Sequence, residues 1–171
     1  NGMQLAIACP DETVAVFTLL QNHPTSRFLF DPNYHRLSKI SQTQPPQIVN
    51  LCWSHVCHTL MQNSNLLLVA TMDKLITVWV MNHPHYGILS TFSTNAVVTC
   101  LEFNPMVQSH LAIGTFDRYL RIHDMVTSTE LEEINTQDIP TCVKFKGDGK
   151  SLLVGMLHGT IREYTYEGQY K

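Results

Sequence analysis

Residues 111–124 read LAIGTFDRYLRIHD, and this stretch decides the fold. Its first part is an apolar run, and from Leu120 onward apolar side chains alternate with polar ones. Between these parts lies Asp117, whose short carboxylate can bond backbone N–H groups two residues further on, as is typical of a tight turn. Two short strands joined by such a turn form a β-hairpin. The stretch therefore predicts a hairpin that turns at Asp117.

The same pattern occurs in three other parts of the chain. Each copy starts on leucine, continues through Ile or Val to a small residue, turns at Asp or His, and ends on a side chain with a ring. The turn residues Asp73, Asp117 and His158 follow one another at the spacing of about 40 to 45 residues that marks a propeller blade. The step from Asp11 to Asp73 is longer. The four copies are residues 5–17, 67–79, 111–123 and 152–164.

Further short strands flank these hairpins, so the repeating unit is four antiparallel strands and the chain is predicted to be all-β. A parallel α/β fold would need helical stretches of about ten residues between strands. Residues 55–63 are the only candidate for one. An immunoglobulin-type sandwich would not repeat at this period. The strands expected before the hairpins are 49–53, 99–103 and 141–145, and those expected after them are 37–43, 89–95 and 131–137.

These units resemble WD40 repeats. The stretches LVATMDKLITVWV, LAIGTFDRYLRIHD and LLVGMLHGTIREYT are similar to the phrase that defines the family, and the resemblance covers nearly the whole chain. It implies a WD40-like β-propeller. The copies also depart from the family, because no Gly-His dipeptide precedes them and Val69, Ile113 and Val154 stand where serine is frequent. The resemblance therefore implies divergent repeats in which the family's buried hydrogen-bond network is incomplete.

The repeats divide the chain into about three and a half blades of four antiparallel strands. Propellers close with about four to eight blades, so the chain is predicted to be part of a larger propeller. A self-closed four-bladed ring is the alternative. The expected division is a blade fragment 1–44 with an insertion at 18–35, a blade 45–95, a blade 96–137 and an incomplete blade 138–171.

Composition narrows the range of partners. The 171 residues are 44% hydrophobic, which suffices for a core, and carry a net charge of −3 with only 11 Lys and Arg. These basic residues are scattered singly, which disfavours a dedicated phosphate-binding surface. The longest uncharged apolar run, residues 66–72, is too short to span a membrane. Five cysteines, mostly in apolar runs, indicate free thiols and an intracellular location in cytoplasm or nucleus.

No cofactor, metal or catalytic site is expected. Four side chains of the zinc-binding type crowd into one short stretch instead of forming two separated pairs, so an ordinary loop is expected there. The chain has no Gly-x-Ser-x-Gly elbow, no phosphate-cradling glycine loop and no His-Glu-x-x-His helix. Cys100 and Cys142 recur at one repeat position, which indicates packing. The zinc-type residues are Cys52, His55, Cys57 and His58, and a second weak pair is His83 and His85.

The remaining function is a platform that binds proteins or peptides through its turns. In the WD40 family the turns between second and third strands lie on the face most used for binding. By resemblance, that face here includes Lys74, Arg118 and Tyr119, together with Glu12 and Gly159. Arg and Tyr are favoured at interfaces, although Arg118 could equally be a solvated turn cation.

The apolar segment Phe28-Leu29-Phe30 in the insertion has two open interpretations. Phe28 and Phe30 could dock a partner, or they could fold back over their own blade.

Two hypotheses about function follow. The first is a non-catalytic interaction scaffold that is one subunit of a multiprotein assembly. The alternative is a propeller that contacts RNA in a ribonucleoprotein complex. The cations available for RNA would be Arg27, Arg36, Lys39, Lys144, Lys146 and Lys150.

Overall fold

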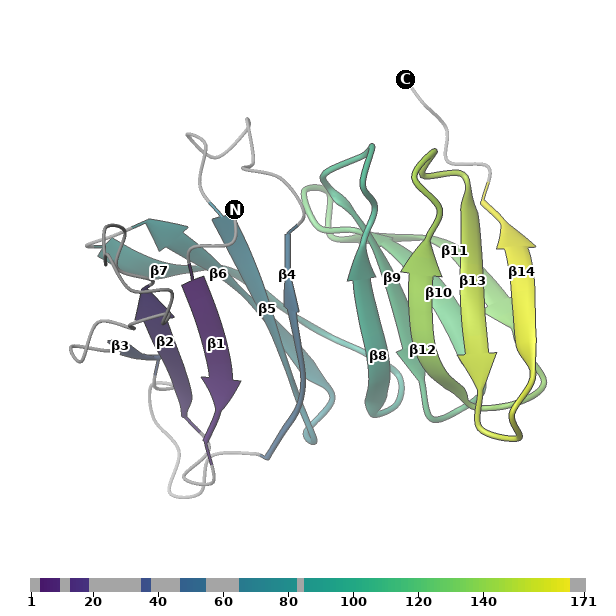
Figure 1. Cartoon of the computed structure of the whole chain (residues 1–171), viewed down its shortest axis with the longest axis horizontal. Helices are drawn as coiled ribbons and strands as arrows, with labels where there is room; N and C mark the ends of the chain where they lie inside the picture. Colours follow the sequence, from purple (N-terminus) through teal and green to yellow (C-terminus); the bar gives the residue numbers. More distant parts are fainter. Residues whose placement is uncertain are drawn as a thin grey trace, which may run out of the picture. The chain divides into compact units, whose positions relative to one another are not determined.

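The computed structural model describes residues 4–9, 13–18, 35–37, 47–54, 65–82 and 85–166 (Figure 1). Their regular structure is β throughout. The strands are β1 (Gln4–Ala8), β2 (Val14–Thr18), β3 (His35–Leu37), β4 (Ile48–Trp53), β5 (Asn65–Thr71), β6 (Leu75–Asn82), β7 (His85–Ser93), β8 (Val98–Phe103), β9 (His110–Thr115), β10 (Tyr119–Asp124), β11 (Thr129–Asn135), β12 (Pro140–Phe145), β13 (Ser151–Met156) and β14 (Ile161–Thr165). The described part of the chain holds no helix suited to crossing a bilayer.

The strands form four antiparallel sheets in which neighbours in sequence are neighbours in space. Two sheets have four strands, β4–β7 and β8–β11, and two have three described strands, β1–β3 and β12–β14. The predicted unit of four antiparallel strands is therefore confirmed in the two complete sheets. The chain forms two compact units, residues 1–48 and 49–171.

The opening stretch LAIGTFDRYLRIHD forms β9, a tight turn and β10. Leu111 pairs with His123 across this hairpin. The same repeat positions pair in the other copies, as Leu5 with Phe17, Leu67 with Trp79 and Leu152 with Tyr164. The four copies that the sequence aligns without gaps thus share one hairpin register.

Side chains of β9 alternate between two cores within residues 49–171. Leu111 and Ile113 join a cluster that includes Leu68 of the β4–β7 sheet. Ala112 joins another cluster with Leu152 of the β12–β14 sheet. Full burial of an aliphatic side chain contributes about 1.5–3 kcal/mol. The three sheets of this unit therefore stack face to face through the apolar stripes of the repeats.

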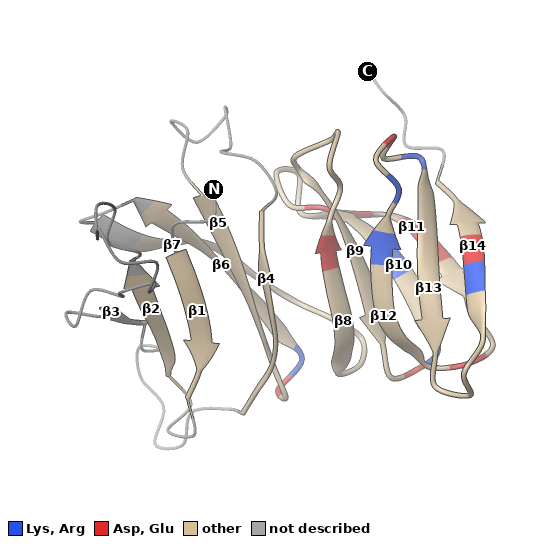
Figure 2. Cartoon of the chain, viewed as in Figure 1, with Lys and Arg blue, Asp and Glu red and all other residues tan. Residues whose placement is uncertain are grey.

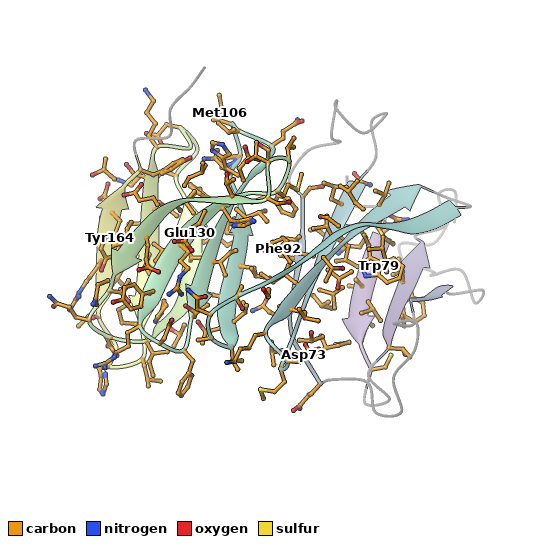
Figure 3. All side chains as sticks on the ribbon, turned by 180° about the vertical axis from the view of Figure 1, so that it is seen from behind. Asp73, Trp79, Phe92, Met106, Glu130 and Tyr164 are labelled. Carbon is orange, nitrogen blue, oxygen red and sulfur yellow. The ribbon has the colours of Figure 1, made fainter. Side chains whose placement is uncertain are left out.

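An aromatic stack joins the β4–β7 and β8–β11 sheets. The ring of Phe92 on β7, labelled in Figure 3, lies on the ring of His123 on β10, with centroids 4.4 Å apart. Burial lowers the pKa of His123, so its imidazole is neutral at pH 7 and packs as an apolar ring. His123 is the residue that stands at the aromatic end of the quoted hairpin.

At Gly114 the β8–β11 sheet packs closely against Pro140 of the β12–β14 sheet. A Cβ added to Gly114 would overlap Cys100 Sγ and lie 3.0 Å from Cγ of Pro140 on β12. Cys100 is buried, and burial raises its pKa to about 11. The packing role predicted for Cys100 is confirmed, whereas its repeat equivalent Cys142 is exposed because no described sheet covers that face.

Candidate protein interface

Three equivalent turns lie at one end of the strands, the lower end in Figure 1, and join β5 to β6, β9 to β10 and β13 to β14. Each turn is closed by one backbone hydrogen bond across its two central residues. The donors are the N–H groups of Lys74, Arg118 and Gly159, at 3.0, 3.2 and 3.0 Å from the acceptor carbonyl oxygens. The backbones of these three turns therefore have the same shape. Side chains at equivalent positions of the turns project from the backbone in the same way.

The turn aspartates bond to side chains of their own hairpins. Asp73 accepts a hydrogen bond from the Thr71 hydroxyl at 2.5 Å, and Asp117 accepts one from the Thr115 hydroxyl at the same distance (Figure 3 labels Asp73). Partial burial works to raise the pKa of Asp117, but hydrogen bonds from Arg121 and Thr115 outweigh it and hold this pKa below the ordinary value. These hydrogen bonds to the carboxylates stabilise the turns.

A buried arginine completes the polar cluster under the β9–β10 turn. The guanidinium of Arg121 donates to Asp117 Oδ2 at 2.9 Å, to Thr115 Oγ1 at 2.6 Å and to Glu133 Oε2 at 2.8 Å. It also lies over the ring of Tyr119, 4.9 Å from the ring centroid. The divergent repeat thus has its own buried polar network built on an arginine. Sequence reasoning missed it, because Arg121 lies at a polar position of the alternating pattern, between the buried residues Leu120 and Ile122.

Lys74 and Arg118 occupy a backbone conformation that usually favours glycine. Their φ angles are 66° and 72°, and Gly159 has 82° at the equivalent position of the third turn. A non-glycine residue in this region costs on the order of 1–3 kcal/mol. Both side chains are exposed, and neither forms an ion pair with any residue that the structure describes. The predicted cations are therefore presented outward despite backbone strain.

Tyr119, the third predicted interface residue, is placed differently. Its ring is half-buried and packs on Arg121, and its hydroxyl lies 3.4 Å from Asn135 Nδ2. Tyr119 therefore supports the turn from below and contributes only part of its surface to the rim.

Each of the three turns also exposes one large apolar side chain at the same position. Met72, Phe116 and Leu157 are 48%, 62% and 58% exposed. Each directly precedes the turn residue Asp or His. Sequence reasoning missed these three side chains, although their recurrence before the turn residue was visible.

Hydrogen bonds to neighbouring loops connect the three turns. The carbonyl oxygens of Lys74 and Arg118 accept from the backbone and hydroxyl groups of Thr94 and Thr136 respectively. The N–H of Phe116 donates to the loop before β8, and the N–H of Leu157 donates to the loop before β12. We call residues 72–74, 116–118 and 157–159 together the turn rim. Each of its three turns is braced by hydrogen bonds to a neighbouring loop.

Basic residues elsewhere are scattered, as Figure 2 shows. Lys144 pairs with Glu102 at 2.5 Å, and Lys146 pairs with Glu163 at 2.5 Å, so two of the cations suggested for RNA binding are already neutralised. The backbone of Arg36 lies in β3 and Lys150 lies before β13. Arg27 and Lys39 lie outside the described residues, as do Glu12, Phe28 and Phe30.

The zinc-type stretch is described only at Cys52. Burial, with a smaller contribution from Glu102, raises the pKa of the Cys52 thiol to about 12, which keeps it protonated at neutral pH. The remaining zinc-type residues, His55, Cys57 and His58, lie outside the described residues, as does His83, while His85 begins β7. Among the residues that are described, no group of three metal-binding side chains gathers.

Comparisons with known proteins agree with this architecture. No family model matches the chain. It is 25% identical over 185 aligned residues to an uncharacterized WD repeat-containing protein of Schizosaccharomyces pombe, which covers 96% of the chain. The chain spans only 29% of that relative's length.

The fold is also found in a solved structure. The computationally designed Ika4 protein matches 97% of the chain and 87% of its own length, with a TM-score of 0.64 at 17% identity. This likeness concerns the fold alone. Together with the four-stranded antiparallel sheets and the similarity to a WD repeat-containing protein, it shows that the chain has a WD40-like β-propeller fold.

Proposed function

We propose that this chain is a non-catalytic protein-interaction scaffold, one subunit of a larger multiprotein assembly, and that it binds proteins or peptides through the turn rim. One observation carries the proposal. The three braced turns repeat the same outward arrangement, in which an exposed apolar side chain precedes a polar or cationic one.

The chemistry of the rim favours a protein partner. Met, Phe and Arg are enriched in protein interfaces because they combine large contact area with adaptable or polar ends. Exposed apolar side chains that gather on one surface commonly mark binding sites. The hydrogen-bonded bracing of the turns also reduces the entropy lost on binding, since the backbone is already ordered.

The alternative of an RNA-contacting propeller has less support. Binding to RNA depends on cations that are free to meet phosphates, whereas Lys144 and Lys146 are paired with Glu102 and Glu163. The cations of the turn rim alternate with apolar side chains and do not form a continuous basic stripe.

Two broader expectations accompany the proposal. The four described cysteines are free thiols, which supports an intracellular location because reducing compartments keep thiols free. The division into blades, as part of a larger propeller, stays a prediction.

Site-specific photo-cross-linking tests the proposed function. A benzophenone amino acid placed at Phe116 should form discrete adducts with a partner protein in cells. The same group at Val126, which is exposed in the β10–β11 turn at the other end of the strands, is the matched control. Adducts at 116 but not at 126 are expected. Equal labelling at both positions, or adducts at neither, would contradict a binding role for the turn rim.

A further inference from the structure

The turn rim presents its positive charges to solvent, while its carboxylates accept hydrogen bonds from side chains of this chain. Asp73 is engaged by Thr71, and Asp117 is engaged by Arg121. Asp138, in the loop before β12, accepts from the His158 ring at 2.7 Å and from the His158 N–H at 3.2 Å. The carboxylates nearest the rim therefore already have donors from this chain.

The two rim cations are held outward by an unfavourable backbone conformation. Glycine would fit the positions of Lys74 and Arg118 without strain, as Gly159 does in the third turn. Backbone strain of this kind clusters at functional sites, so a residue with an unfavourable φ angle points to a functional role. Two equivalent turns carry a basic side chain where the fold needs none. The strain therefore points to a role for the basic side chains of Lys74 and Arg118.

The cations stand among the exposed apolar side chains. Along the rim, Met72 and Lys74 belong to one turn, and Phe116 and Arg118 belong to the next, which is connected to it through the loop before β8. Leu157 follows on the third turn through the loop before β12. A ligand that lies across the three turns meets apolar and cationic groups in succession.

We infer that the turn rim binds an acidic segment of a partner protein, an inference that rests on the proposed function. Aspartate or glutamate carboxylates of this segment pair with Lys74 and Arg118, and its apolar side chains pack on Met72, Phe116 and Leu157. Charge complementarity selects the carboxylates, since the rim's own carboxylates are already bound. The aliphatic and thioether side chains of Leu157 and Met72 favour a protein segment, because the bases of a nucleic acid stack on aromatic rings and would use only Phe116 among the three.

Selection from a random dodecapeptide library displayed on phage, with the chain immobilised, supplies the probe. Enriched peptides should combine Asp or Glu with apolar residues. Titration of the best synthetic peptide against Lys74→Gly and Arg118→Gly should show about tenfold weaker binding for each variant. Because glycine relieves the strained backbone, both variants should keep or exceed the thermal stability of the wild type. Arg118→Glu should shift enrichment toward basic peptides.

Ser128→Gly is the matched control. Ser128 also has a positive φ, 55°, but lies in the β10–β11 turn at the other end of the strands. This variant should gain or keep stability and leave peptide binding unchanged. A loss of binding in Ser128→Gly equal to that in Arg118→Gly would overturn the assignment of the acidic segment to the turn rim.

The outcomes separate this inference from the proposed function. If Phe116→Ser or Leu157→Ser abolishes peptide binding while Lys74→Gly and Arg118→Gly do not, the rim binds proteins but the acidic-segment inference is overturned. If none of these variants affects binding, the proposed function fails as well. Tight, steeply salt-dependent binding of polyuridylic acid that Arg118→Glu abolishes would overturn both in favour of RNA.

Discussion

The buried face of the β8–β11 sheet and the outward face of the β12–β14 sheet use the same repeat positions in different surroundings. Leu120, opposite Gly114, is completely buried, whereas Ile161, opposite Gly155, is 76% exposed. The two faces share an apolar pattern and a strand register. The difference teaches that the neighbouring sheet, and not the repeat itself, determines whether an apolar stripe becomes core.

Charged residues at equivalent repeat positions also differ in burial between these two sheets. Glu102 on β8 is buried and is reached by Lys144, which stands at the equivalent position on β12 of the next sheet. Lys144 itself is exposed. One position of the repeat thus links neighbouring sheets through an ion pair. The predicted larger propeller would place a further sheet on the outward face.

The largest expected difference between the two faces is in the free energy of unfolding when Leu120 or Ile161 is truncated to alanine. Leu120→Ala should lower the free energy of unfolding by about 2–5 kcal/mol, because it leaves a cavity between two stacked sheets. Ile161→Ala should change it by only about 0.5 kcal/mol, since Ile161 already meets solvent. Urea denaturation followed by tryptophan fluorescence measures both. Equal losses would show that the two faces are equally packed.

A smaller difference is expected for added methyl groups. Gly114→Ala should destabilise the protein by about 1–3 kcal/mol, because its Cβ would meet Cys100 and the ring of Pro140. Gly155→Ala should cost less. There the added Cβ would come within 2.5 Å of Cys142 Sγ, and that exposed side chain has room to move. Thermal melting of the two variants compares them, and a larger effect for Gly155→Ala would contradict the arrangement.

The smallest expected effect is on how the free energy of unfolding falls at acid pH, and it arises from Asp117 in the buried Arg121 cluster. Since the pKa of Asp117 is lowered in the folded state, its contribution is complete above the ordinary aspartate pKa and is lost as pH falls through the folded value. Asp117→Asn should lose about 1 kcal/mol at pH 7 and show a flatter decline between pH 5 and pH 3. Denaturation across that range checks the slope. An unchanged slope would remove Asp117 from the acid response.

Much of the fold could be predicted because the repeat is local. Hairpin register depends on residues within a few positions of one another, so the spacing from Leu111 to His123 was enough to predict it. The placement of Lys74 and Arg118 at exposed turn positions could be predicted from the same alignment.

The remaining features depend on contacts between sheets and on backbone conformation. The exposure of Cys142 against the burial of Cys100 reflects what lies on each face, which no single repeat encodes. The Arg121 cluster depends on side chains of β9, β10 and β11 meeting in space. The backbone strain at Lys74 and Arg118 became visible only with their φ angles.

Native-state thiol labelling tests the stacking of the repeats most directly. Cys100 and Cys142 are equivalent in the repeat, and mass spectrometry can follow both in one sample treated with iodoacetamide. The account predicts rapid labelling of Cys142, and labelling of Cys100 only at the rate of unfolding, because burial raises the Cys100 pKa to about 11. Equal labelling rates for the two thiols in the native protein would contradict face-to-face packing of the β8–β11 and β12–β14 sheets.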